Sequence, residues 1–297
     1  MSRTPRPAAD VRVDPELVRA LVRGQFPQLA GLEVRFADDG WDNAIYRLGT
    51  DLLVRLPRRL LSSQLVLNEQ RWLPGIARRV TVDIPVPVRA GEPTEFYPWP
   101  WSVTPWFPGL VVAGQPRAQR ADLAEPLAAF LADFAEAAPD DAPENPWRGV
   151  PLVDRDVSVR ERLTSGLVPD ADAASRLWDR ALSQPVWAGP RLWVHGDLHP
   201  ANLVAVDGAL GAVLDFGDLT AGDPATDLAA AWLVFDERGR ARFRDAIDRS
   251  RDIDAATWIR AEGWALCLAT ALLTASDDSP VHRRIGEETL AELLAGD

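Results

Sequence analysis

Hydrophobic and polar positions in the first hundred residues predict two helices and a set of short strands. Asp14, Pro15 and Glu16 supply an N-cap, a proline at the first helical position and an acid in the first turn. The apolar residues that follow recur on one helical face, and a second helix is predicted over residues 62–73. Short strands are predicted at residues 32–37, 44–48, 51–56, 86–90 and 99–106.

After Phe107-Pro108-Gly109 the pattern becomes mainly helical. Between residues 191 and 218, however, short apolar runs alternate with Gly, Asp and Asn, and two strands, 203–206 and 212–214, are expected to pair as a hairpin. The predicted helices cover residues 117–138, with a kink at Pro126, then 156–182, and then 223 to the end.

Strands first and helices later predict an α+β fold of two lobes, a small antiparallel-sheet N-lobe and a mainly helical C-lobe. We expect a disordered lead over residues 1–13, an N-lobe over 14–107 and a C-lobe over 108–297.

The chemical signal is concentrated between residues 193 and 227. His195, Asp197 and Asn202 have the H-x-D-x-x-x-x-N spacing of a kinase catalytic loop, and Asp215-Phe216-Gly217 begins 13 residues after Asn202. A polar hairpin with solvated aspartates is the plainer interpretation. However, a chain would rarely carry both the H-x-D-x-x-x-x-N spacing and Asp-Phe-Gly at this distance by chance.

These residue types suit phosphoryl transfer, which depends on positioning and on neutralising charge. Asp197 fits the carboxylate that must face an attacking hydroxyl. Asn202 and Asp215 offer the hard oxygen ligands that Mg²⁺ prefers. His195 taken alone is better interpreted as a brace for the loop.

Three stretches resemble the signature of the aminoglycoside phosphotransferase family, whose members phosphorylate aminoglycosides, macrolides, choline, homoserine and sugars. They are HGDLHPANL at residues 195–203, LDFGD at 214–218 and GDPATDLA at 222–229. Weaker similarities lie at residues 40–57, 68–74 and 101–106. The resemblance implies a protein-kinase-like fold, an N-lobe that binds nucleotide, and transfer of phosphate from ATP or GTP, with Mg²⁺, to a small hydroxylated substrate.

The resemblance also implies roles for individual residues. Asp197 would be the catalytic base or orient the nucleophile, while Asn202 and Asp215 would hold the metal. Arg55 stands where the family has a lysine that pairs with the nucleotide phosphates, and Glu69 would be its ion-pair partner. An arginine can still bind phosphate and carboxylate, although its guanidinium is larger and planar.

Further nucleotide contacts follow from the same resemblance. His199 would contact a phosphate or make a hydrogen bond within the loop. The adenine or guanine ring of the nucleotide would form hydrogen bonds with backbone groups around Pro105 and Phe107. The loop at residues 40–43 has a single glycine, so its backbone would offer few phosphate contacts. Three other aspartates have mainly structural interpretations: Asp223 as an N-cap, Asp227 as a brace of the catalytic loop, and Asp218 as either a brace or a substrate-facing acid.

Charge and composition exclude some classes of binding partner. The net charge of −12 argues against nucleic acid, and no apolar run approaches the roughly 18 residues of a membrane span. Residues 1–109 hold 14 Arg against 12 Asp and Glu, whereas residues 110–297 hold 18 against 32. An acidic second lobe would suit a cationic substrate, or merely keep the protein soluble. All 32 basic residues are arginines.

Cys267 is the only cysteine, which fits a reducing cytoplasm, and the N-terminus lacks the apolar centre of a secretory signal. The leading hypothesis is an O-phosphotransferase, possibly for a cationic antibiotic such as an aminoglycoside. A kinase of an amino sugar or amino alcohol stays open, as does a pseudokinase that binds nucleotide without turnover. The sequence leaves the acceptor, the choice of ATP or GTP, and the oligomeric state undetermined.

Overall fold

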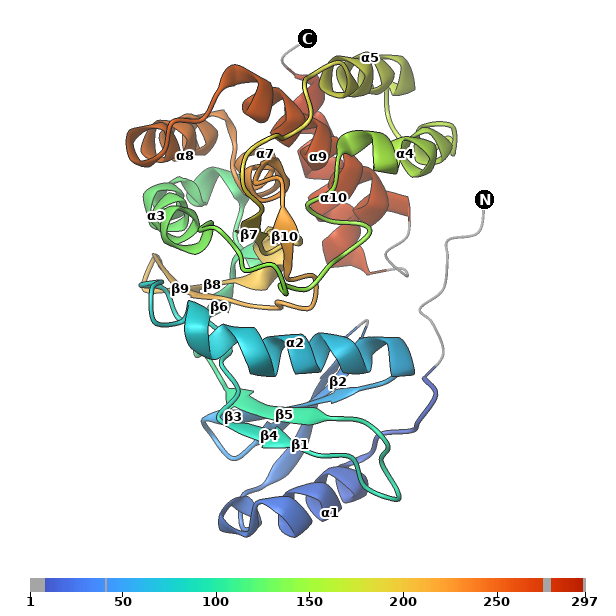
Figure 1. Ribbon diagram of the computed structural model, residues 1–297, viewed down its shortest axis with the longest axis vertical. Helices are drawn as coiled ribbons and strands as arrows, with labels where there is room; N and C mark the ends of the chain where they lie inside the picture. Colours follow the sequence, from blue (N-terminus) through green and yellow to red (C-terminus); the bar gives the residue numbers. More distant parts are fainter. Residues whose placement is uncertain (1–8, 41, 275–278, 296–297) are drawn as a thin grey trace.

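The computed structural model describes residues 9–40, 42–274 and 279–295. Its N-terminal part contains an antiparallel sheet of five strands (Figure 1). The strand order is β1-β2-β3-β5-β4. One helix, α1, lies on the outer side of the sheet, and a second, α2, lies between the sheet and the C-lobe. The elements are α1 (Pro15–Gln25), β1 (Val34–Asp39), β2 (Asn43–Leu48), β3 (Leu52–Pro57), α2 (Leu60–Ile76), β4 (Arg89–Gly91) and β5 (Trp101–Pro105).

Most N-lobe predictions are confirmed. Asp14 caps α1 by accepting hydrogen bonds from the N–H groups of Glu16 and Leu17. The first strand begins two residues later than predicted because Leu32 still belongs to a turn, where its N–H donates to Leu29 O.

The C-lobe is mainly helical, with short strands on the side that faces the N-lobe (Figure 1). Its strands are β6 (Leu110–Val111), β7 (Leu192–Val194), β8 (Leu203–Val206), β9 (Ala209–Val213) and β10 (Thr220–Gly222). Its helices are α3 (Ala124–Phe134), α4 (Asp156–Leu163), α5 (Ala171–Leu182), α6 (Ala225–Leu228), α7 (Ala230–Val234), α8 (Glu237–Ser250), α9 (Ala255–Thr274) and α10 (Pro280–Leu294). The predicted hairpin is confirmed as β8 and β9, and the predicted helical character from residue 223 is confirmed for the described residues.

Two predicted helices are wrong in extent. Residues 117–123 form 3₁₀ turns, so α3 begins at Ala124, and Pro126 falls in its first turn, where a missing N–H costs no hydrogen bond and causes no kink. The helix predicted over 156–182 is two helices, because the intervening residues include Gly166 at φ 78° and Pro169.

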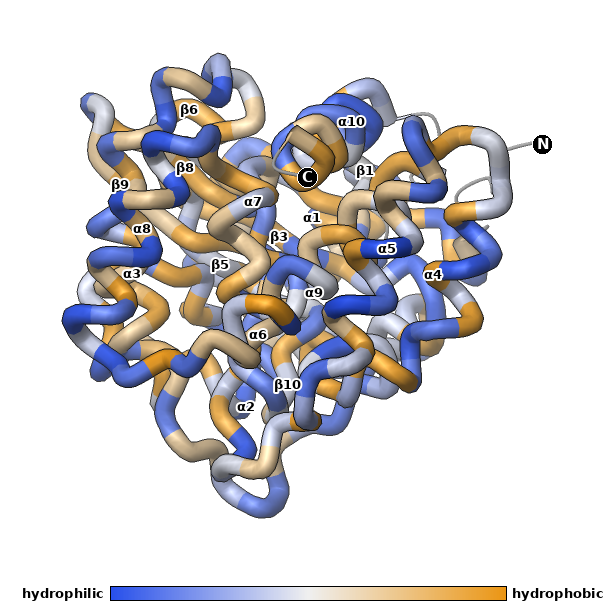
Figure 2. Tube along the Cα trace, turned by 90° about the horizontal axis from the view of Figure 1, so that it is seen from above, coloured by the Kyte–Doolittle hydropathy of each residue, from blue (hydrophilic) through white to orange (hydrophobic). Residues whose placement is uncertain are grey.

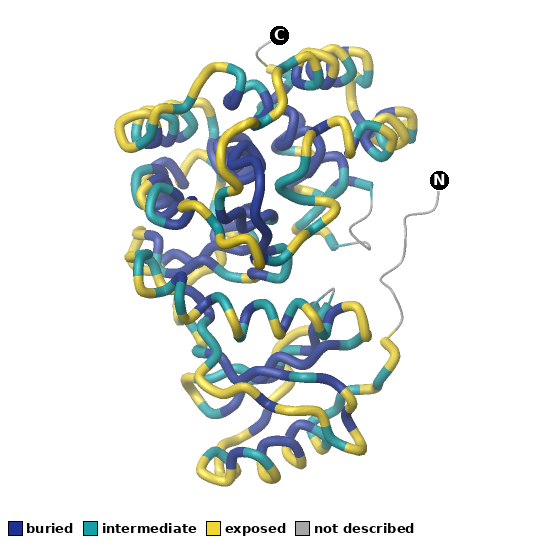
Figure 3. Tube along the Cα trace, in the orientation of Figure 1, coloured by how far each residue is buried: buried dark blue, intermediate teal, exposed yellow. Residues whose placement is uncertain are grey.

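Each lobe has its own hydrophobic core, and buried residues fill the centre of both (Figure 3). Viewed from above, the outer helices carry both hydrophilic and hydrophobic residues (Figure 2), and hydrophilic residues are most frequent in α8. Trp99 and Trp101 are buried in the N-lobe core, so they pack the sheet and do not line a cleft. The C-terminal end of α2 contributes Leu73 and Ile76 to the C-lobe core, which ties this helix to both lobes.

None of the helices in the described parts of the chain is long and apolar enough to cross a bilayer. The expected disordered lead lies largely in residues 1–8, outside the described residues. The boundary at residue 107 stays a prediction.

Candidate active site

Asp227 of α6 fixes the backbone of the loop between β7 and β8. The Asp227 carboxylate accepts hydrogen bonds from the N–H groups of His195 (2.7 Å) and Gly196 (2.9 Å). The Asp197 N–H donates to His195 Nδ1, so His195 Nε2 carries the proton and donates to Leu214 O at 2.9 Å. The predicted bracing roles of Asp227 and His195 are confirmed, and His195 links the catalytic loop to the loop after β9.

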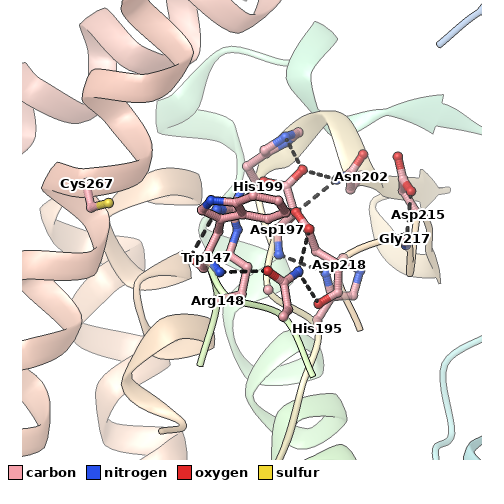
Figure 4. Close-up of polar contacts among 12 residues, drawn as sticks. Trp147, Arg148, His195, Asp197, His199, Asn202, Asp215, Gly217, Asp218 and Cys267 are labelled. Atoms are coloured by element: carbon pink, nitrogen blue, oxygen red, sulfur yellow. Dashed lines mark hydrogen bonds and ion pairs between the residues drawn. The ribbon is translucent and has the colours of Figure 1, made fainter. Parts of the chain in front are cut away.

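The two oxygens of Asp197 have different surroundings (Figure 4). Oδ2 lies 3.3 Å from His199 Nε2 and 3.3 Å from Asn202 Nδ2. Among the residues that the structure describes, the polar contact of Oδ1 is Arg148 Nη2, at 3.8 Å. Burial acts to raise the pKa of Asp197, but the positive charges of His199 and Arg148 outweigh it and hold that pKa well below its usual range. Asp197 is therefore an ionised carboxylate with one oxygen available to a hydroxyl group.

Asn202 lies beside Asp197, and Asp215 lies beyond Asn202 (Figure 4). The Asn202 amide nitrogen donates to Asp197 O at 2.9 Å, which leaves its Oδ1 as a potential metal ligand. The backbone bond from Leu214 N to Asn202 O (2.8 Å) places Asp215 next to this amide. Within the described residues, no three His, Cys, Asp or Glu side chains gather as a metal cage. An amide oxygen and exposed carboxylates fit Mg²⁺, which takes few protein ligands and shares phosphate oxygens.

Arg55 and Glu69 form a buried ion pair. Arg55 Nη1 lies 2.9 and 2.7 Å from the two Glu69 oxygens, and the side chains are 9% and 2% exposed. Burial acts to lower the pKa of Arg55, but Glu69 and Asp215 raise it above its ordinary value, so the guanidinium stays charged. Arg55 Nη2 lies 3.7 Å from Asp215 Oδ1, which connects this pair to the expected metal site.

A family model described as the phosphotransferase enzyme family matches residues 33–264. The chain belongs to this family. Its members transfer phosphate to hydroxyl groups, and this chain is such a phosphotransferase. No curated protein sequence matches the chain significantly.

Solved structures show the same kinase-like fold. The GDP complex of aminoglycoside 2′-phosphotransferase-IIIa has a TM-score of 0.70 at 19% identity, covering 95% of this chain and 99% of that one. The streptomycin–ATP complex of APH(2″)-IIa has a TM-score of 0.59 at 17% identity, covering 89% and 91%. The macrolide 2′-phosphotransferase MphH from Brachybacterium faecium has a TM-score of 0.60 at 19% identity, covering 93% and 97%. At these identities the likeness concerns the fold.

The remaining predicted residues are His199, Pro105 and Phe107. His199 is buried and contacts Asp197 directly. Pro105 is the last residue of β5, and Phe107 lies in the connection from β5 to β6. The Trp106 N–H between them donates to Asp51 O, so it is already used within the sheet.

The loop at residues 40–43 is partly described, because Trp41 lies outside the described residues. The Gly40 N–H donates to Asn43 O, so this amide is used within the loop. The Asp42 carboxylate accepts hydrogen bonds from Arg59 (2.7 Å) and Ser62 (2.6 Å), which fixes the loop against the start of α2.

Sequence reasoning missed Arg148 and Asn145. Arg148 Nη2 lies 3.2 Å from Asp218 Oδ2 and also contacts Asp197 (Figure 4). Asn145 Nδ2 donates to Asp218 Oδ1 at 2.8 Å. Both residues come from a proline-rich loop between α3 and α4, with no motif spacing that links them to the catalytic loop. The role of Asp218 was left open by the sequence; in the structure its Oδ1 accepts a hydrogen bond from Asn145 and its Oδ2 forms an ion pair with Arg148.

Proposed function

We propose that this phosphotransferase moves the γ-phosphate of ATP or GTP to a hydroxyl group of a small molecule, with Asp197 as the catalytic residue. The observation that carries the proposal is the ionised Asp197 carboxylate, whose Oδ1 accepts no hydrogen bond from the described residues. The other oxygen, Oδ2, is held by His199 and Asn202, so Oδ1 is the one that faces an incoming hydroxyl.

In the reaction, the acceptor oxygen forms a bond to the γ-phosphorus while the bond from that phosphorus to the β–γ bridging oxygen breaks. The hydroxyl proton passes to Asp197 Oδ1, and ADP or GDP leaves. Arg55, fixed by Glu69, would contact the α- and β-phosphates, and His199 would lie near the γ-phosphate. Mg²⁺ held by Asn202 and Asp215 would neutralise charge on the phosphates. Backbone groups around Pro105 and Phe107 would receive the base.

For the acceptor we propose a hydroxylated antibiotic, with an aminoglycoside first. The similar structures are named as aminoglycoside and macrolide phosphotransferases, and two of them hold GDP or streptomycin with ATP, which supports both the acceptor class and the donor choice. A kinase of an amino sugar or amino alcohol is the second candidate. The intact set of Asp197, Asn202 and Asp215 speaks against a pseudokinase.

The test measures ADP or GDP formation with kanamycin, streptomycin, erythromycin, choline and glucosamine as acceptors, each with ATP and with GTP. We expect turnover with at least one antibiotic, loss of turnover in EDTA, and recovery with added Mg²⁺. Asp197→Ala should abolish turnover and leave nucleotide affinity nearly unchanged, whereas Asp179→Ala, at an exposed surface pair, should behave as wild type. Comparable turnover in Asp197→Ala would remove the role assigned to this carboxylate.

A further inference from the structure

Arg148 lies between two carboxylates on the side of Asp197 away from the expected metal site (Figure 4). The same nitrogen, Nη2, is 3.8 Å from Asp197 Oδ1 and 3.2 Å from Asp218 Oδ2. The Arg148 side chain is 19% exposed. Burial acts to lower its pKa, but Asp218 and Asp197 raise it, so the guanidinium is charged. One arginine therefore balances two carboxylates next to the oxygen that would receive the acceptor proton.

The backbone on both sides of Arg148 is fixed to the strand and helix that follow the expected metal loop. The Asn145 N–H donates to Thr220 Oγ1 at 3.1 Å, and the Gly149 N–H donates to Thr226 Oγ1 at 3.2 Å. Gly149 O in turn accepts from Asp223 N at 2.9 Å. Because these bonds hold the loop at two points, Arg148 has little freedom to leave its position between the carboxylates.

From this geometry we propose that Arg148 is a positioning residue for phosphoryl transfer: it offsets the repulsion between Asp197 and Asp218 and keeps Asp197 Oδ1 turned toward the acceptor. This inference rests on the proposed function, because it assigns Arg148 a part in the same reaction. His199 and Asn202 hold only Oδ2, so the orientation of the carboxylate plane depends on the group beside Oδ1. Without Arg148, Asp197 and Asp218 would repel each other and Asp197 would rotate toward solvent.

The test compares the kinetics of Arg148→Ala, Arg148→Lys, Asp218→Asn and the double variant Arg148→Ala/Asp218→Asn. Turnover is measured with kanamycin and with erythromycin, and as phosphate release from ATP or GTP with Mg²⁺ in water. We expect Arg148→Ala to lower kcat on the order of 10²-fold with nucleotide KM nearly unchanged, because only the acceptor side is disturbed. Lysine should recover part of the loss.

The double variant is the decisive comparison. Removing the second carboxylate removes the repulsion that Arg148 offset, so Arg148→Ala/Asp218→Asn should turn over faster than Arg148→Ala alone. A merely structural role would appear as lost stability in Arg148→Ala, with the kcat of the folded protein unchanged, and not as a loss of kcat that the double variant recovers. Arg191→Ala is the matched control: this arginine lines the same cavity of about 770 Å³ as Arg148, donates to a backbone carbonyl, and should leave kcat unchanged.

Thermal unfolding of the same variants supplies a readout that needs no acceptor. The Tm changes of Arg148→Ala and Asp218→Asn should be non-additive. The inference is overturned if Arg148→Ala keeps wild-type kcat, if the double variant shows no recovery, or if the Tm changes add. A wild-type chain that phosphorylates no acceptor while the Tm changes remain coupled would instead refute the proposed function.

Discussion

Removing Glu69 would leave Arg55 as a buried positive charge without its main partner. The Arg55 side chain is 9% exposed, and Glu69 accepts both hydrogen bonds from its Nη1. Breaking a buried pair from one side costs about 3–5 kcal/mol, since the remaining charge stays desolvated. Asp215 Oδ1, 3.7 Å from Nη2, still offsets part of that charge, so we expect Glu69→Ala to cost about 3 kcal/mol, the lower end of this range.

The same substitution should also weaken nucleotide binding, because Arg55 would no longer be fixed toward the phosphates. The double variant Arg55→Met/Glu69→Leu separates the two effects. Replacing a buried ion pair by apolar residues of similar volume is often neutral for stability, so this variant should unfold within about 1 kcal/mol of wild type. It has no cation for the phosphates, however, and its nucleotide KM should stay raised.

Urea unfolding followed by far-ultraviolet circular dichroism gives the stabilities, and the rate of ADP or GDP formation against nucleotide concentration gives KM. A loss below about 1 kcal/mol in Glu69→Ala would mean that the pair is solvated, contrary to its burial here. A double variant with wild-type nucleotide KM would show that the phosphates are held by other groups, and the role of Arg55 would then be structural.

Two further predictions concern the frame behind the catalytic loop. The Asp223 carboxylate lies 2.7 Å from the buried Arg260 guanidinium. Asp223→Ala should therefore lower the free energy of unfolding by about 3–5 kcal/mol, because Arg260 would keep its charge without a partner. A decrease below about 1 kcal/mol in urea unfolding would contradict this. Gly196→Ala should lower kcat by roughly 10²-fold, since φ is 88° and a Cβ there would lie 2.8 Å from a carbonyl oxygen of the loop after β9. Gly208→Ala, at φ 84° with open space around it, is the control and should keep wild-type kcat in the same assay.

The sequence predicted those parts of the site whose contacts are close along the chain. His195, which lies 19 residues before the carbonyl of Leu214, was expected to brace the loop, and the family resemblance implied the ion pair of Arg55 with Glu69, 14 residues away. Asn145 and Asp218 are 73 residues apart. A proline-rich loop has no periodic pattern that indicates which distant segment it will contact. The contact of Asn145 with Asp218 could therefore be found only from the three-dimensional structure.

Helix boundaries were predicted less well than strands, for a physical reason. The stretch from 117 to 138 has helical periodicity, but Arg117 and Arg120 instead donate to backbone carbonyls at the end of α7, including Trp232 O and Val234 O. These long-range bonds hold the backbone in short 3₁₀ turns before α3 begins. Tertiary hydrogen bonds of this kind outweigh local propensity, which differs by less than about 1 kcal/mol per residue.

The acidic excess of residues 110–297 gives little support to a cationic acceptor once the positions of the carboxylates are known. Many of them pair with arginines: Asp122 and Glu125 with Arg242, Asp179 with Arg160, Glu262 with Arg180 and Glu292 with Arg240. Each of these carboxylates is offset by the arginine that it pairs with, and exposed charges more than a Debye length apart are largely screened at physiological salt. We therefore expect the groups next to Asp197, and not the net charge of the lobe, to decide which acceptors bind. Among these groups, Asp218 already forms an ion pair with Arg148.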